Sequence, residues 1–208
     1  EDSDIASVEN LDGKMIGTQR GTTGNIYCTD DYGEDHITTY DNGLTAVQAL
    51  MNGQVDCVVI DQEPAKAFVA ANQGLKIIDT EYVTEDYAIC IAKDNNELLN
   101  QVNDALAEII ADGTVEQITK NYIGDDTKGT CPYVSPEGQT YENGTLVVAT
   151  NAAFPPYEFY DGGEIVGIDM ELIKAIGDKL GMDVKIEDIE FDSIINAVDS
   201  HKADVGIA

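Results

Sequence analysis

Two segments far apart in the chain repeat the same pattern of residue types. Residues 46–60 and residues 194–208 can be aligned so that each contains helical apolar spacing, a turn, an aspartate and an apolar strand. Strands that alternate with helices of this length are typical of α/β units built on mostly parallel sheets. The repeat therefore predicts a two-lobed α/β fold, in which helices flank mostly parallel sheets and a cleft lies between the lobes.

Apolar spacing and turn residues predict the elements of a first unit, residues 1–123. The expected elements are strands at 14–18 and 55–60, and helices from about 25, at 44–51, from 61, at 95–111 and at 115–122. Residues 75–78 and 87–92 are also strand-like. We expect the helix at 44–51 to turn one face towards the core, the face that carries Leu44, Val47, Leu50 and Met51.

A stretch without sustained apolar periodicity separates this unit from a second one. Residues 124–144 are rich in Gly, Asp, Thr, Pro and Glu, which predicts a linker. The second unit, residues 145–208, begins with an apolar strand. Its further expected elements are a helix at 170–180, a strand at 182–189, a helix at 194–198 and a strand at 205–208.

The chain is strongly acidic. Its 208 residues include 11 basic and 40 acidic ones, which gives a net charge of −29. Such a surface repels phosphate backbones and anionic lipid, so we expect neither nucleic acid nor a membrane surface as a partner. No run approaches the roughly 20 apolar residues of a membrane helix, and no signal peptide is visible at Glu1. We therefore expect a soluble, mature or trimmed product.

The four cysteines and two histidines show no metal-ligand spacing, so we expect no metal site and no cofactor. Cys57 and Cys90 lie in strand-like runs, where a free cysteine behaves as a small buried hydrophobe. Cys28 and Cys131 have more polar surroundings and could pair outside the cytosol. The sequence does not fix the connectivity.

The second unit opens with a strand that ends in a polar pair and an aromatic loop. The apolar run 146–149 leads into Thr150 and Asn151, and then into Phe-Pro-Pro-Tyr at residues 154–157. This segment resembles the opening strand and ligand-binding loop of the polar amino-acid-binding proteins that serve ABC importers, the solute-binding proteins of the family 3 type. The resemblance implies a periplasmic-binding-protein-like fold that closes on a hinge around a free amino acid. It also implies delivery to an importer permease outside the cytoplasm, without a catalytic step.

Two loops of the first unit match ligand-binding positions of that family. Residues 19–25 resemble its strand-to-helix loop, in which Thr23, Gln19 and the backbone at Gly21 would hold the ligand carboxylate. Asp61 matches the acidic residue after the strand, and would be the counter-ion of the ligand ammonium. The alternatives are an ordinary strand-to-helix turn for the first loop, and a helix cap for Asp61. Capping and ligand binding can coexist at Asp61.

Three positions of the second unit match as well. Asn151 stands where the family often has an aspartate, so it would contribute an amide contact and no charge. Phe154 matches an aromatic wall of the pocket, and Phe191 matches a position on the opposite side of the ligand. Both phenylalanines could instead be core residues. Asp169 follows the helix entry of the family, where we expect a structural role.

The chain departs from the family after residues 205–208. There the family continues into a Gly-x-Thr-x-Thr-x-x-Arg loop, and Arg20, the only arginine, lies on the wrong loop to replace that arginine. The resemblance implies the order carboxyl-side lobe, linker, amino-side lobe. A tandem array, a circular permutation and a missing joining segment all fit this order. We expect weak or absent ligand binding in a chain that ends at Ala208.

Two other functions fit the same fold. One is a periplasmic dehydratase acting on prephenate-like acids, for which Asp61 and Glu63 could supply acid–base chemistry. The other is the ligand-binding module of a membrane receptor or sensor. Among amino acids, we expect a neutral polar or cationic ligand, because the chain is acidic and Arg20 is the only basic residue near the matched positions.

Overall fold

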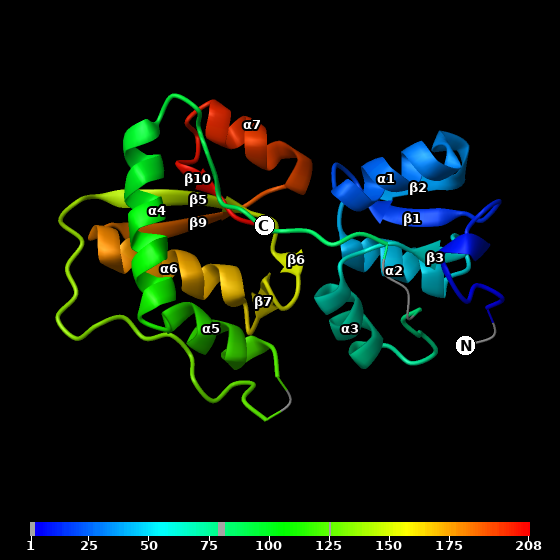
Figure 1. Ribbon diagram of the computed structural model, residues 1–208, viewed down its shortest axis with the longest axis horizontal. Helices are drawn as coiled ribbons and strands as arrows, with labels where there is room; N and C mark the ends of the chain where they lie inside the picture. Colours follow the sequence, from blue (N-terminus) through cyan, green and yellow to red (C-terminus); the bar gives the residue numbers. More distant parts are fainter. Residues whose placement is uncertain (1–2, 79–81, 125) are drawn as a thin grey trace. The chain divides into compact units, whose positions relative to one another are not determined.

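The computed structural model describes residues 3–78, 82–124 and 126–208 and divides into two compact units (Figure 1). Unit 1 comprises Glu1–Tyr87 together with two short stretches, Ala153–Pro155 and Glu190–Asp192. Unit 2 comprises Ala88–Ala152, Pro156–Ile189 and Ser193–Ala208.

Unit 1 is built on a three-stranded parallel sheet in the order β2-β1-β3. Its strands are β1 (Ile16–Gln19), β2 (Ile37–Tyr40) and β3 (Cys57–Val58). Its helices are α1 (Thr23–Tyr32), α2 (Gly43–Met51) and α3 (Gln62–Ala71), with short 3-10 turns at Val8–Asn10, Glu34–His36 and Phe191–Ser193, the last shared with unit 2. Strand β6 (Ala153–Phe154) also falls in unit 1. All four residues of β1 are buried, as expected for a central strand.

Unit 2 is built on a four-stranded sheet in the order β4-β10-β5-β9. Strands β5, β9 and β10 are parallel, and β4 joins β10 as an antiparallel edge. The strands are β4 (Cys90–Ile91), β5 (Thr145–Thr150), β9 (Asp183–Asp188) and β10 (Val205–Gly206), with a hairpin of β7 (Glu158–Asp161) and β8 (Glu164–Val166). The helices are α4 (Asn96–Ala111), α5 (Thr114–Tyr122), α6 (Ile168–Leu180) and α7 (Ile194–Asp199).

Local sequence signals explain where several helices begin. The side chain of Thr22 caps α1 by accepting from the backbone N–H of Asn25 at 3.2 Å. Asn42 caps α2 and Asn95 caps α4 in the same way. Each cap satisfies one of the backbone N–H groups that a helix start leaves without a partner.

The core of unit 2 lies where α4, α5 and α6 pack on its sheet. The core residues Leu146, Val148, Ile173, Ile176 and Val205 are fully buried. These positions alternate along β5 and recur at helical spacing along α6. The predicted strand at the start of the second unit and the predicted helices at 95–111 and 170–180 are therefore confirmed, within one or two residues at their ends.

Several predictions for unit 1 are wrong in detail. The predicted strand at 55–60 shortens to Cys57–Val58, and no strand forms at 75–78. Helix α2 buries Val47 as predicted but leaves Leu44 and Met51 exposed, and it also buries Gly43 and Ala46. The close approach at the start of α2 explains this face: a Cβ at Gly43 would lie 2.5 Å from Ile60 Cδ1. Strand β2 and the β7–β8 hairpin were not predicted.

The segment 124–144 forms no helix or strand in its described part, but it is tied to α6. The hydroxyls of Tyr133 and Tyr141 donate to the Asp178 carboxylate at 2.8 and 2.9 Å. The Gln139 amide donates to the Asp178 carbonyl at 2.8 Å. These contacts differ from the behaviour of a free linker, because they hold the segment on the surface of unit 2.

The compact units do not coincide with the predicted segments 1–123, 124–144 and 145–208. Residues 88–123 belong to unit 2, because α4 packs on α6 and Ile91 pairs with Val205. The predicted order of an ancestral carboxyl-side lobe, a linker and an amino-side lobe stays a prediction.

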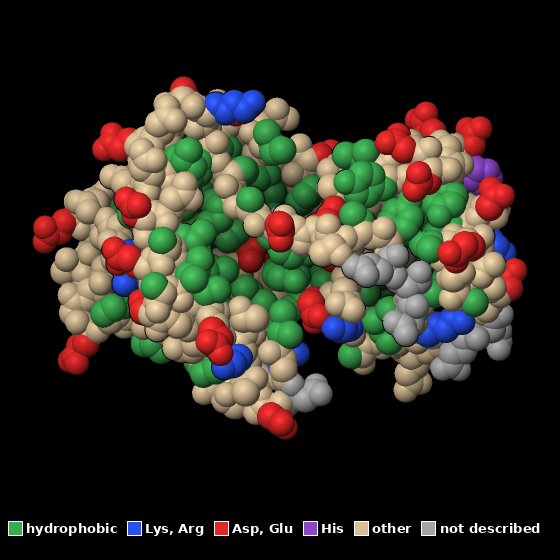
Figure 2. All heavy atoms as spheres, viewed as in Figure 1, with side chains coloured by type: hydrophobic (Ala, Val, Ile, Leu, Met, Phe, Trp, Pro, Cys, Tyr) green, Lys and Arg blue, Asp and Glu red, His purple; other side chains and the backbone are tan. Residues whose placement is uncertain are grey.

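Acidic side chains are spread over the face of the molecule shown in Figure 2, and basic ones are few. Of the helices within residues 3–78, 82–124 and 126–208, none is both long and apolar enough to span a membrane.

Candidate functional site

Three loops of unit 1 begin where its parallel strands end. Arg20 and Gly21 follow β1, Asp41 follows β2, and Asp61 comes three residues after β3. Because the three strands are parallel, their carboxyl ends lie at one edge of the sheet. In open α/β sheets this edge is where ligands bind.

The loop between β1 and α1 places a helix start at this edge. Gly21 has φ +80°, a backbone conformation that side chains disfavour, and its N–H lies 3.4 Å from Asn25 Oδ1. The Thr22 hydroxyl donates to the Gln19 carbonyl at 2.8 Å, which fixes the turn. Thr23 is the first residue of α1, so the helix begins two residues earlier than predicted. The N–H groups and partial positive charge of such a helix start suit a carboxylate.

Asp61 occupies the residue before α3, but its side chain makes no capping hydrogen bond. Its carboxylate instead accepts a hydrogen bond from the hydroxyl of Tyr87. The alternative that the Asp61 side chain caps the helix is therefore wrong. The role of Asp61 as a counter-ion for a ligand ammonium stays a prediction.

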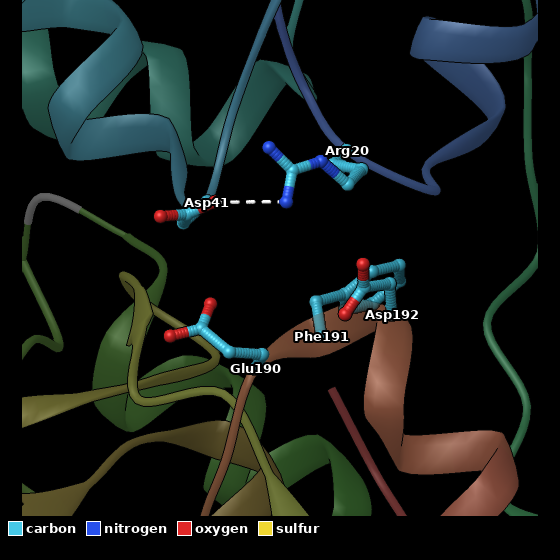
Figure 3. A pocket seen from close by; sticks show the side chains of 5 residues that line it. All are labelled: Arg20, Asp41, Glu190, Phe191 and Asp192. Carbon is cyan, nitrogen blue, oxygen red and sulfur yellow. Dashed lines mark ion pairs between the residues drawn. The ribbon is translucent and has the colours of Figure 1, made fainter.

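A small pocket adjoins the same edge and is lined by Arg20, Asp41, Glu190, Phe191 and Asp192 (Figure 3). Arg20 Nη1 and Asp41 Oδ1 form an ion pair at 3.1 Å. The space in this pocket that a water-sized molecule can occupy is about 10 Å³, which is room for about one water. This pocket is therefore too small to hold a whole amino acid and its side chain.

One of the residues that line the pocket, Asp192, explains why position 21 is a glycine. A Cβ there would lie 3.3 Å from the Cβ of Asp192, closer than most such contacts. The sequence analysis missed Asp41, Glu190 and Asp192 as neighbours of the predicted site. A signal existed for Asp41, since it directly follows β2, but that strand was not predicted.

The predicted site residues divide between the units. Gln19, Gly21, Thr23 and Asp61 lie in unit 1, and so do the two phenylalanines, Phe154 in β6 and Phe191 in the pocket wall. Phe154 and Phe191 are half-buried, so neither is a fully buried core residue.

Asn151 lies in unit 2 at the end of β5 and is buried. Its amide nitrogen donates to the Ile189 carbonyl at 2.9 Å, which ties β5 to the segment after β9. This bond gives Asn151 a structural role, and its predicted contact with a ligand stays a prediction.

Unit 2 contains a pair of carboxyl groups beside the Pro-Pro loop. Glu158 on β7 is 1% exposed, and Asp169 lies in the first turn of α6. Burial raises the pKa of Glu158 to about 11, and the charge of Asp169 adds to that effect. Burial also raises the pKa of Asp169 to about 6. Two buried carboxylates cannot both ionise without a large cost, so Glu158 keeps its proton at neutral pH.

The backbone fixes this pair where β7 meets α6. The N–H groups of Ile168 and Asp169 donate to the carbonyls of Pro156 and Tyr157 at 3.1 and 3.0 Å. Gly167 permits this approach, since a Cβ there would lie 2.0 Å from the Tyr157 oxygen. The geometry supports the structural role expected for Asp169. Within the residues that the structure describes, no three His, Cys, Asp or Glu side chains are grouped as a metal site.

Residues 32–125 and 146–208 match the family described as bacterial extracellular solute-binding proteins, family 3. The chain belongs to this family, which confirms the resemblance predicted from the sequence. The two matched blocks are separated by residues 126–145, close to the predicted linker.

Individual relatives are named as amino-acid-binding proteins. The chain is 34% identical over 118 residues to ABC transporter arginine-binding protein 1 of Escherichia coli (strain K12), covering 54% of this chain and 49% of that protein. It is 28% identical over 123 residues to the L-cystine-binding protein TcyJ of the same strain, covering 59% of this chain and 46% of that protein. The chain spans about half the length of the curated relatives it matches.

A solved structure supports the fold. A mutant of ArgBP from T. maritima matches with a TM-score of 0.54 and 32% identity, covering 58% of this chain and 53% of that one. The two-lobed solute-binding fold class predicted from the sequence is thereby confirmed.

Proposed function

We propose that this protein binds a free amino acid and delivers it to the permease of an ABC importer. The names of its relatives support this, since they are arginine- and cystine-binding proteins, and the first is assigned to an ABC transporter. Its extracellular family supports a location in the periplasm or at the outer face of the cell membrane. The proposal includes no catalytic step, because the relatives are named as binding proteins.

The observation that carries the proposal is the shared sheet edge of unit 1. A helix start follows β1 and a carboxylate follows β3, and these strands are direct neighbours in the sheet. A free amino acid carries a carboxylate and an ammonium a few ångströms apart, and a pocket must answer both charges. The loop with Gln19, Gly21 and Thr23 offers N–H groups to the carboxylate, and Asp61 offers a negative charge to the ammonium.

The charges near this edge favour a neutral polar or cationic side chain on the ligand. Arg20 is already paired with Asp41, and Glu190 and Asp192 line the same small pocket. An acidic side chain would meet carboxylates there, whereas a guanidinium or ammonium would be attracted. Phe154 and Phe191 would supply apolar contact with the ligand, and Asn151 an amide contact.

The test is a titration of the ¹⁵N-labelled chain with L-arginine, L-glutamine and L-glutamate, followed by the NMR shifts of backbone amides. NMR also detects binding of millimolar affinity. We expect saturable shifts at residues 19–25 and 61 with arginine or glutamine, and none with glutamate. Removal of the predicted counter-ion in Asp61→Asn weakens this binding at least about tenfold, the equivalent of roughly 1.4 kcal/mol.

Asp30→Asn is the matched control. It removes one negative charge from an exposed position near the end of α1, away from the sheet edge, and leaves the affinity unchanged. Shifts that map elsewhere, or equal affinity in Asp61→Asn and the unchanged chain, would refute the proposed site.

A further inference from the structure

Unit 1 contains two cysteines, and they lie in the same buried cluster. Cys28 lies on α1 and is fully buried, and Cys57 opens β3 and is 9% exposed. Both belong to the cluster that also includes Ile5, Leu11 and Ile16. All four cysteines of the chain are free thiols in this structure.

Sheet register explains why the two thiols share this cluster. Cys57 is in register with Ile16 on the neighbouring strand, so their side chains point to the same face of the sheet. Ile37 is the other register partner of Ile16, and it packs against the same cluster. Cys28 is the buried residue of α1, the helix that packs on β1 and β2. The cluster therefore brings a helix thiol down onto the sheet face that carries the strand thiol.

We propose that Cys28 and Cys57 form a disulfide bond in the oxidising surroundings outside the cytoplasm and so link α1 to β3. The family of this chain is extracellular, and disulfides form and persist in that environment. The bond would close a loop across residues 28–57, which includes β2 and α2. It would thus staple most of the small sheet domain that carries the proposed binding loops.

The other two cysteines are placed differently. Cys90 lies on β4 beside Gly206, where a Cβ would approach its sulfur to 2.5 Å. The thiol of Cys131 lies 3.5 Å from the Gln117 carbonyl, next to α5. Both belong to unit 2, whereas Cys28 and Cys57 belong to unit 1. The pairing of Cys28 with Cys131 that the sequence left open would have to join the two units.

The chemistry requires a two-electron oxidant, and a low-molecular-weight disulfide such as glutathione disulfide supplies it. The thiolate of one cysteine attacks a glutathione sulfur and releases one glutathione thiolate. The second cysteine thiolate attacks the resulting mixed disulfide at the protein sulfur and releases the other. The two protein thiols lose two electrons and two protons, and the glutathione disulfide becomes two glutathione thiols.

The disulfide must form while the chain folds, because burial protects both thiols in the folded chain. Burial raises the pKa of Cys28 to about 11 and that of Cys57 to about 12, and the charge of nearby Cys28 adds to the effect at Cys57. The thiolate is the reactive form, so exchange in the folded chain is slow. We therefore expect oxidation while the chain folds.

The test refolds the reduced chain with glutathione and glutathione disulfide, unfolds it in denaturant with N-ethylmaleimide to block all remaining thiols, and digests it with trypsin. Residues 21–66 then form one peptide that contains Cys28 and Cys57 and no other cysteine. We expect this peptide without maleimide and about 2 Da lighter than its reduced form. Cyanogen bromide cuts it after Met51, and the two fragments stay joined until a reductant is added.

Other products would overturn the proposal. These are a peptide 21–66 that carries maleimide or glutathione, and one joined to residues 77–93 or 129–174, which contain Cys90 and Cys131. The double variant Cys90→Ala with Cys131→Ala should form the bond as before.

Stability gives a second readout. Oxidation should raise the Tm by roughly 10 °C, the shift that a loop of about 30 residues implies for a chain of this size. The same shift is expected in the double variant and is absent in Cys57→Ala. Equal Tm values for the reduced and oxidised chain would contradict the proposed staple.

Discussion

Unit 2 has a broader apolar core than unit 1. Among the described residues, its buried cluster draws on α4, α5, α6, β5 and β10. The cluster of unit 1 rests on Ile5, Leu11, Ile16 and two cysteines, and its strands have only two to four residues. The loops with the predicted ligand contacts belong mostly to the smaller core.

This difference in core size indicates that the two units are stabilised in different ways. A broad core holds its elements with many apolar contacts, whereas a small core leaves more of its stability to caps, short hydrogen bonds and cross-links. In unit 1 the cap of α1 and the hydrogen bond from Tyr87 to Asp61 lie at the sheet edge that we propose for ligand binding, whereas the proposed cross-link begins at Cys57, at the amino end of β3. Substitutions should therefore act through packing in unit 2 and through local contacts in unit 1.

The largest expected effect is at Gly167 in unit 2. Alanine there would place a Cβ 2.0 Å from the Tyr157 carbonyl oxygen, at a φ of +137°. We expect Gly167→Ala to lower the free energy of unfolding by about 4 kcal/mol or more, measured by urea denaturation.

Gly163→Ala is its control in the same region. Gly163 also has a positive φ, of +92°, but a Cβ there would meet nothing within 4 Å. Only backbone strain remains, which costs about 1 kcal/mol. If both variants lower the free energy of unfolding by similar amounts, the close contact of Gly167 with the Tyr157 carbonyl does not limit the stability of unit 2.

The second prediction concerns pH. The pKa values of Glu158 and Asp169 are raised in the folded chain, to about 11 and about 6, so the folded state binds more protons than the unfolded one. Stability from these groups is fully present below about pH 4 and is lost as the pH rises towards those values. Glu158→Gln removes the larger part of this dependence. It should be stabilising relative to the unchanged chain by on the order of 3 kcal/mol at pH 8, and nearly neutral at pH 4.

The measurement is urea denaturation across that pH range. Glu164→Gln, at an exposed position of the same hairpin, should leave the pH profile unchanged. If Glu158→Gln is destabilising at pH 8, the buried carboxyl has a polar partner that the amide cannot replace, and the assigned protonation is wrong.

The sequence predicted those parts of the fold whose signal is local and long. Strand β5 and the helices α4 and α6 carry sustained apolar periodicity, so their existence followed from residue spacing. Strand β2 has only four residues, two of them threonine, and none is fully buried. Its apolar pattern was too short to detect.

Features that depend on tertiary contacts were beyond the sequence. The face that α2 buries follows from the approach of Gly43 to Ile60, and the docking of segment 124–144 follows from Asp178. For the candidate site, Asp61 and the loop around Gly21 were predicted because they resemble ligand-binding positions of the family and follow predicted strands. Asp41 was missed with its strand, and the bond from Tyr87 to Asp61 joins positions 26 residues apart.

The smallest effect is expected in unit 1, at the cap of α1. Thr22→Ala removes the hydroxyl that accepts from Asn25 N–H and donates to the Gln19 carbonyl, at 3.2 and 2.8 Å. A lost cap of this kind costs about 1 kcal/mol. Thr22→Ser keeps the hydroxyl and should restore most of this stability, as measured by amide hydrogen exchange in α1. Because the turn at Gly21 depends on the same hydroxyl, Thr22→Ala should also weaken ligand-induced shifts at residues 19–25, whereas Thr22→Ser should not. Full ligand response in Thr22→Ala would mean that the sheet edge is held by the strands alone, and the contrast drawn between the two units would lose its strongest local example.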